Sequence, residues 1–301
     1  MILIFVIGYL AITLEHNIHI NKTATALLTG VLCWAVYALN ASDVHIVSEQ
    51  LSHHLGDIAE IVFFLLGAMT IVELVDAHDG FAIITQKIKT QDVKTLMWLV
   101  ALLTFFMSAV LDNLTTAIEM VSLLRKILVS SETRKIMVGL VVIAANAGGA
   151  WSPLGDVTTT MLWIGKQVSA MGVITQLLLP SMVSLIVPLL YLHFTLKPKG
   201  NVFSAKLDNT MALPNAERNL MFAVGLGALL FVPVFKTVTH LPPYMGMMLS
   251  LGIVWLVSEY IHPEEKFDKN NKHLFSALHA LSRIELSSIL FFLGILLGVG
   301  A

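Results

Sequence analysis

The sequence is poor in charged residues. They make up 13% of its 301 residues, and 56% of the residues are apolar, whereas soluble domains carry roughly 25% charged residues. So few charges cannot cover the surface of a soluble protein of this size, which excludes that class. The net charge of −2 and the lack of any basic run give no indication of a nucleic-acid partner.

Cysteine is nearly absent as well. The single cysteine, Cys33, lies in an apolar stretch, which excludes a disulfide framework and a cysteine-based metal site. The segment 1–14 lacks the basic start and the small-residue cleavage site of a signal peptide, so we interpret it as a first membrane helix. Protease motifs such as His-Glu-x-x-His are missing too, and the sequence predicts no enzyme.

Long apolar runs dominate what is there. A helix needs about 20 apolar residues to cross the hydrocarbon core of a membrane. Runs of this kind predict an all-α polytopic membrane protein with spans at 1–14, 22–40, 58–75, 175–196, 219–237, 243–261 and 286–301.

Two further apolar stretches are interrupted by polar residues. Residues 96–129 form two arms of about 16 residues, each short for a span, and this predicts a re-entrant hairpin with its tip at Asp112–Asn113. Residues 136–172 contain glycines and a proline that disfavour a continuous helix. They predict a broken helix whose break includes Gly148, Gly149, Ser152, Pro153 and Gly155.

Basic residues indicate the orientation. Both feet of the predicted hairpin are basic, as is the loop 197–218, whereas the loop 41–57 has no Lys or Arg. By the positive-inside tendency the feet and the loop 197–218 are cytoplasmic and 41–57 is outside. The basic residues concerned are Lys87, Lys89, Lys94, Arg125, Lys126, Arg134, Lys135, Lys197, Lys199, Lys206 and Arg218.

Two pairs of similar short segments suggest an internal repeat. The sequence around Trp34 resembles that around Trp255, and Ile61-Val-Phe-Phe-Leu resembles Ile289-Leu-Phe-Phe-Leu. With opposite predicted orientations, they favour an inverted-repeat secondary transporter. We therefore expect a first repeat at 1–196 with scaffold helices at 1–75, a cytoplasmic linker at 197–218, and an incomplete second repeat at 219–301.

The polar residues of the two interruptions are the candidate site. Polar groups at membrane depth must face protein, water or an ion, and hard cations such as sodium prefer oxygen ligands. We predict Na⁺ at Asp112 and Asp156. A proton competes for the same carboxylates, because burial disfavours a bare carboxylate and a cation favours it. The alternative for each aspartate is a helix N-cap. The predicted transport residues are Asp112, Asn113, Thr115, Thr116, Asn146, Asp156, Thr158 and Thr159.

Two glutamates are secondary candidates. Glu119 follows Asp112 by seven residues and shares its helix face, and Glu73 lies near the end of the span 58–75. Solvation at a water-accessible position is the alternative for Glu73.

Three motifs carry a family resemblance. The segments Glu15–Lys22, Leu111–Thr116 and Asn146–Thr160 resemble NhaD-type sodium/proton antiporters of the ion transporter superfamily. The resemblance implies exchange of cytoplasmic Na⁺ (and Li⁺) for external H⁺ in a bacterial inner membrane, without a cofactor. It also implies a transport domain that moves against a scaffold. Matched residue by residue, it assigns function to Asp112, Asn113, Asn146, Asp156, Thr158 and Thr159.

The sequence departs from that family at its end. The second hairpin and second glycine-rich break of the family would lie beyond Ala301, so we expect a partial sequence, with a homodimer that completes the site as the alternative. Two other functions stay open: an arsenite or dicarboxylate carrier of the same superfamily, and a non-transporting membrane subunit.

Overall fold

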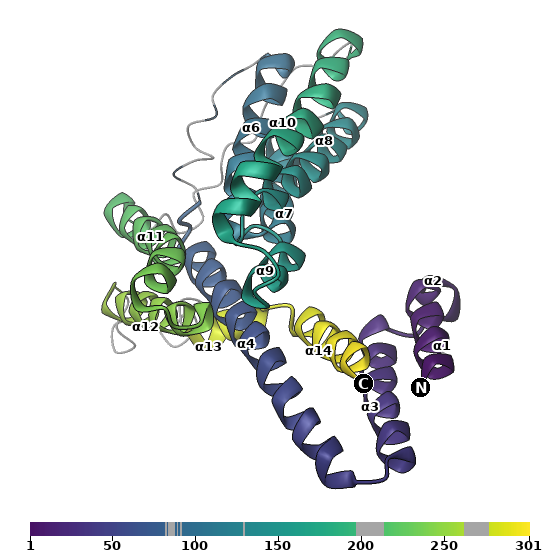
Figure 1. Ribbon diagram of the computed structural model, residues 1–301. Helices are drawn as coiled ribbons and strands as arrows, with labels where there is room; N and C mark the ends of the chain where they lie inside the picture. The colour runs from purple at the N-terminus through teal and green to yellow at the C-terminus, as the bar shows by residue number, and fades with distance from the viewer. Residues whose placement is uncertain are drawn as a thin grey trace.

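The computed structural model describes residues 1–81, 83, 88, 90, 92–128, 130–196, 214–261 and 277–301, and these residues fold into helices (Figure 1). In chain order the helices are α1 (Ile2–Thr13), α2 (Glu15–Ile18), α3 (Lys22–Asn40), α4 (Val44–Ala77), α6 (Val93–Leu111), α7 (Asn113–Ile127), α8 (Ser131–Ala150), α9 (Val157–Ile164), α10 (Ala170–Thr195), α11 (Asn215–Thr239), α12 (Pro243–Ile261), α13 (Ala277–Arg283) and α14 (Leu286–Gly300).

The helices are those of a multi-pass membrane protein. In the described part of the chain, six are long and apolar enough to cross a membrane: α3, α4, α6, α10, α11 and α12. Large apolar side chains also point outward, with Leu39 84% and Phe194 79% exposed. Apolar side chains in such positions are suited to lipid rather than to water. The all-α polytopic prediction is confirmed.

Helix α4 corrects the predicted loop at 41–57. The helix begins at Val44, because Asp43 caps it by accepting a hydrogen bond from the His45 amide at 2.8 Å. Its 34 residues span about 51 Å at about 1.5 Å per residue, well beyond a hydrocarbon core of about 30 Å. The polar first turns therefore form a helix that extends past the apolar span 58–75.

Helices α6 and α7 form the predicted hairpin, with its tip at Asp112. The Ser108 hydroxyl near the end of α6 donates to the Ala145 carbonyl near the end of α8 at 2.5 Å. At the other end of the bundle Arg134, at the start of α8, donates to the Leu128 carbonyl just after α7. Helices α6 and α8 thus run parallel and α7 antiparallel to both. That the hairpin is re-entrant stays a prediction.

The broken helix is present, but its break is shorter than predicted. Helix α8 continues through Asn146, Gly148 and Gly149 to Ala150, and the interruption before α9 is limited to residues 151–156. Placing Gly148 and Gly149 in the break was wrong. Both are buried in the last turn of α8, where their missing side chains allow close packing.

Three glycines form a close crossing of chain segments. A Cβ on Gly148 would overlap the carbonyl oxygen of Phe105 on α6 and lie 2.8 Å from its carbonyl carbon and Cα, and one on Gly155 would lie 2.8 Å from the Cα atoms of Ala109 and Gly149. Small residues permit such backbone approach in membrane helices. The crossing brings the end of α6, the end of α8 and the break together, and it places Asp112 near Asp156.

The remaining boundaries differ in detail. Helix α10 begins at Ala170, so residues 170–172 belong to it rather than to the broken helix. Helix α11 begins at Asn215, inside the predicted linker, and its buried Arg218 pairs at 3.5 Å with Asp79, two residues past the end of α4. Residues 197–213 of that linker, with Lys87 and Lys89 of the predicted hairpin foot, lie outside the described residues.

The contacts between the outer helices form two sets that match each other. Helix α14 packs against α3, and α12 packs against α4, while α1 lies on α3 and α11 on α12 (Figure 1). The similar segments around Trp34 and Trp255, and around Ile61 and Ile289, suggest that α11, α12 and α14 repeat α1, α3 and α4. In that case the contact of α14 with α3 corresponds to that of α4 with α12, and the contact of α1 with α3 to that of α11 with α12. The packing fits the inverted repeat, which stays a prediction with the two-repeat division of the chain.

Candidate functional site

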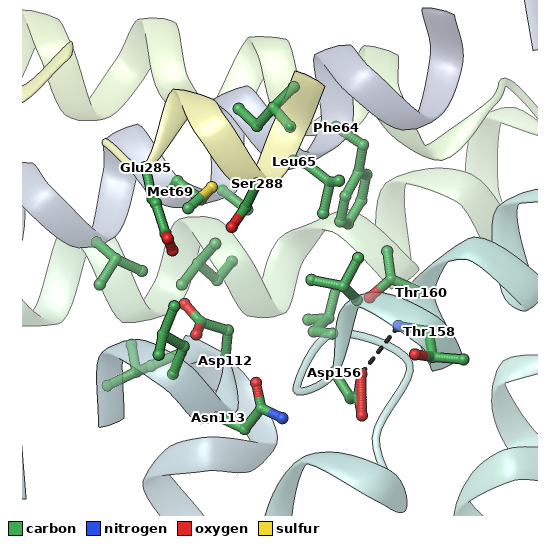
Figure 2. A pocket seen from close by; sticks show the side chains of 18 of the residues that line it. Phe64, Leu65, Met69, Asp112, Asn113, Asp156, Thr158, Thr160, Glu285 and Ser288 are labelled. Atoms are coloured by element: carbon green, nitrogen blue, oxygen red, sulfur yellow. Dashed lines mark hydrogen bonds between the residues drawn. The ribbon is translucent and has the colours of Figure 1, made fainter. Parts of the chain in front are cut away.

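A cavity of about 250 Å³ lies where the hairpin tip and the break meet the outer helices (Figure 2). Residues of α4, α11, α12 and α14 form its far side. The described polar residues that line it are Asp112, Asn113, Asp156, Thr158, Thr160, Glu285 and Ser288. Phe64, Leu65, Met69, Leu154, Leu229 and Phe292 are among its apolar walls.

Asp112 sits at the hairpin tip in a strained conformation. Its φ of 79° and ψ of 156° fall in a region that is nearly confined to glycine and costs about 1–3 kcal/mol for other residues. Both carboxylate oxygens are held by Thr115: the amide donates to Oδ1 at 2.9 Å and the hydroxyl to Oδ2 at 2.7 Å. Asp112 therefore caps α7, and it also lines the cavity, so the N-cap and the site residue are the same group.

Asn113 joins the tip to the broken helix. Its side-chain amide donates to the Oδ1 atom of Asn146 at 3.1 Å, and Asn146 in turn donates to the Val142 carbonyl one turn back on α8. The second bond orients the Asn146 amide so that its oxygen faces Asn113. The predicted proximity of the two polar segments is thus realised through this amide pair.

Asp156 occupies the equivalent position at the break. It caps α9, with Oδ1 accepting from the Thr158 amide at 2.9 Å (Figure 2). The buried Thr160 hydroxyl donates to the Pro153 carbonyl at 2.8 Å and fixes the loop that carries Asp156. Both aspartates thus stand at helix N-termini and accept hydrogen bonds from their first-turn amides.

Some predicted residues lie away from the cavity wall. Thr115 acts on Asp112 rather than on the cavity, and the half-buried Glu119 is two turns further along α7. Thr116 is fully buried, and its Oγ1 has no hydrogen-bond partner among the described residues. Thr159 is half-buried beside the lining residues Thr158 and Thr160. Glu73 lies just past the cavity on α4 and pairs with Arg283 at 3.5 Å.

Glu285 and Ser288 are lining residues that the sequence reasoning missed. Both come from the start of α14, and their side chains point toward Asp112 from the opposite wall (Figure 2). The available signal was position: Glu285, like Asp112 and Asp156, is an acid that directly precedes an apolar helix. Unlike them, Glu285 forms no side-chain cap hydrogen bond.

The cavity is electrostatically negative. Three carboxylates line it, those of Asp112, Asp156 and Glu285, and no Lys or Arg does so among the described residues. Asp112 is close enough to Asp156 and to Glu73 for each pair of carboxylates to repel. Within the described part of the chain, no three His, Cys, Asp or Glu residues form a metal-binding group. A cation bound here would therefore draw on amide, hydroxyl and backbone oxygens beside the carboxylates.

Comparison with known proteins gives consistent similarities. The model of the citrate transporter family CitMHS matches residues 8–301. Over 303 residues the chain is 49% identical to sodium/proton antiporter 1 and 47% identical to sodium/proton antiporter 2, both of Arabidopsis thaliana. It is also 29% identical over 328 residues to the Na(+)/H(+) antiporter NhaD of Vibrio cholerae.

The chain is shorter than these relatives. The alignments cover 100%, 100% and 99% of the chain but 52%, 71% and 67% of the three relatives. It thus spans about half the length of the first relative.

Proposed function

The chain belongs to the CitMHS citrate transporter family, and we propose that within it this protein is an NhaD-type antiporter that exchanges Na⁺ (and Li⁺) for H⁺. The family makes it a transport protein rather than an enzyme. The names of its relatives support the choice of ions, and the cavity supports it independently.

The lining of the cavity carries the proposal. Three carboxylates, an amide and hydroxyls face the space, without a described Lys or Arg. Carboxylates that repel one another are stabilised by a cation or a proton placed between them. A dicarboxylate or citrate would meet the same repulsion, with no Lys or Arg among the described lining residues to offset it. The lining therefore favours a cation over an anion as the cargo.

Exchange follows from competition for the same oxygens. A sodium ion at Asp112 and Asp156 requires both carboxylates to be ionised, whereas a proton on either removes a ligand charge. Sodium and protons then exclude one another, and a cavity open to one side at a time exchanges them. Asn113 adds an amide group to the lining, held by its hydrogen bond to Asn146. The helix N-termini at Asp112 and Asp156 hold the empty carboxylates in place.

The membrane is a separate proposal. We propose a bacterial inner membrane, as the motifs imply, and the NhaD relative of Vibrio cholerae agrees with it. The two relatives at 47–49% identity come from a plant, so localisation of the tagged protein in its source cells is the measurement that decides. A homodimer is likewise proposed only as an alternative and is tested by the mass of the purified protein.

The transport proposal is tested in everted vesicles from cells that express the protein. Addition of Na⁺ or Li⁺ to vesicles with an acidified lumen should release protons, and citrate should not. Asp112→Asn and Asp156→Asn should each abolish the response, because each removes a carboxylate from the cavity. Asp57→Asn is the matched control, since Asp57 is an exposed acid on α4 that pairs with His53. Sodium-dependent proton movement in both cavity variants would refute the assignment.

A further inference from the structure

A pair of ion contacts lies one helical turn from the cavity, between α4 and the short helix that leads into α14. The Nε atom of Arg283 is 3.5 Å from Glu73 Oε2, and its Nη2 atom is 3.6 Å from Asp76 Oδ2. Glu73 and Asp76 are three residues apart, so they share a face of α4. One guanidinium thus spans two carboxylates of a single helix, an arrangement to which its planar fork is suited.

The two carboxylates of these contacts are largely shielded from solvent, whereas the guanidinium is about half exposed. Side-chain exposure is 22% for Glu73, 28% for Asp76 and 47% for Arg283. Glu73 Oε2 is buried and has no hydrogen-bond partner within the described residues, so the Arg283 charge is its compensation. Removing one partner of such a pair leaves an uncompensated charge, which is why partly buried pairs are sensitive to substitution.

The position of Arg283 in the chain connects it to the site. Arg283 ends α13, and Glu285 follows two residues later at the start of α14. On the α4 side, Val72 and Met69 line the same cavity, and Glu73 directly follows Val72. The ion contacts therefore join the two walls of the cavity that face Asp112, just beside Glu285.

Local structure does not account for the direction of Glu285. Asp112 and Asp156 are oriented by hydrogen bonds to the helices they cap, whereas Glu285 makes no cap bond to α14. Its carboxylate nevertheless points across the cavity toward Asp112 (Figure 2). A contact that fixes the chain just before Glu285 would orient its side chain, which no cap hydrogen bond does.

We propose that Arg283 is a positioning residue: its contacts with Glu73 and Asp76 fix the start of α14 so that Glu285 and Ser288 face Asp112. Arg283 itself does not touch the cargo. The inference rests on the proposed cation transport for its functional consequence, but the geometry it asserts can be measured without transport.

The first test is kinetic. Arg283→Gln should raise the apparent KM for Na⁺ by about tenfold, with a smaller change in maximal rate, because a displaced ligand can cost up to about a hundredfold. Arg283→Lys should recover part of the loss, since a point charge can contact one carboxylate but not span two. Arg125→Gln, on the exposed side of α7, is the matched control and should behave as the wild type. A fall in maximal rate and abundance with an unchanged KM would overturn the proposal.

The second test measures geometry. In a Cys33→Ala background, Met69→Cys with Ser288→Cys places one thiol on each of the two joined walls. Cross-linking by a short bifunctional reagent should slow severalfold when Arg283→Gln is added, and not when Arg125→Gln is added. An unchanged rate would refute positioning. Slower cross-linking in the Arg283→Gln background, combined with full transport by Asp112→Asn, would support the positioning role of Arg283 and refute the proposed function.

Discussion

The glycine crossing makes a quantitative prediction about α8. Ala in place of Gly148 would put a methyl group 2.8 Å from the carbonyl carbon and Cα of Phe105, whereas contacts closer than 3.4 Å are uncommon for real Cβ atoms. The Phe105 carbonyl oxygen lies nearer still, so relief requires α6 and α8 to separate by more than about 0.6 Å, the difference between these two distances. Overpacking of this kind costs about 1–3 kcal/mol, and removal of glycine from a helix returns about 1 kcal/mol.

The same helix offers a matched control. Gly139 is exposed on α8, and a Cβ there would meet nothing within 4 Å. Gly139→Ala should therefore gain stability through helix propensity alone, whereas Gly148→Ala should lose about 1 kcal/mol net. The two variants are expected to differ by about 2 kcal/mol, which corresponds to several degrees in melting temperature.

The measurement is thermal unfolding of the purified protein in detergent, with sodium-dependent proton movement in vesicles as the second readout. Because Asn146 is two residues before Gly148, separation of the helices should also weaken the Asn113–Asn146 hydrogen bond and reduce the apparent affinity for sodium. If Gly148→Ala were as stable as Gly139→Ala, the close approach of α6 and α8 would be wrong.

Three further predictions concern side chains that form hydrogen bonds near helix ends. Hydrogen bonds from the hydroxyl and the amide of Thr95 lower the pKa of the exposed Asp92, which caps α6. The stability lost in Asp92→Ala should therefore be full at neutral pH and vanish as the pH falls through the lowered value, as pH-dependent melting would show; a loss independent of pH would contradict this. Ser108→Ala removes the buried bond to Ala145 and should cost about 1 kcal/mol of stability, measured by the same melting assay. Thr115→Val keeps the amide cap on Asp112 but removes the hydroxyl bond, so it should raise the apparent KM for Na⁺ about fivefold. Thr115→Ser should stay near the wild type, and equal behaviour of the two variants would exclude a role for that hydroxyl.

The sequence predicted the features that depend on local chemistry. The interruptions at Asp112 and at residues 151–156 follow from charged residues and Pro153 in otherwise apolar runs, because such residues disfavour a continuous membrane helix. The capping of α7 by Asp112 was likewise foreseeable, since the Asp-x-x-Thr spacing allows its carboxylate to accept from Thr115.

The predictions failed where the structure depends on contacts with segments that are distant in the sequence. Glycine in a membrane helix either permits unwinding or permits close packing, and for Gly148 the choice depends on Phe105, more than 40 residues away. The helical start of α4 was missed because hydropathy identifies the part inside the membrane and not how far the helix continues beyond it. Glu285 was overlooked because its neighbours in the cavity come from α4 and the hairpin tip, which no local pattern specifies.

The glycine crossing also bears on how the cavity can open. Because α6, α8 and the break touch through backbone atoms at Gly148 and Gly155, the loops that carry Asp112 and Asp156 form one rigid block. The described glycines of α14 pack instead against α1, α3 and α4. Glu285 belongs with α4 and α13 through the ion contacts of Arg283. We therefore expect that a change in access separates the two walls of the cavity. The two aspartates would move together relative to Glu285. The cargo would keep one set of oxygens throughout and exchange the other for water.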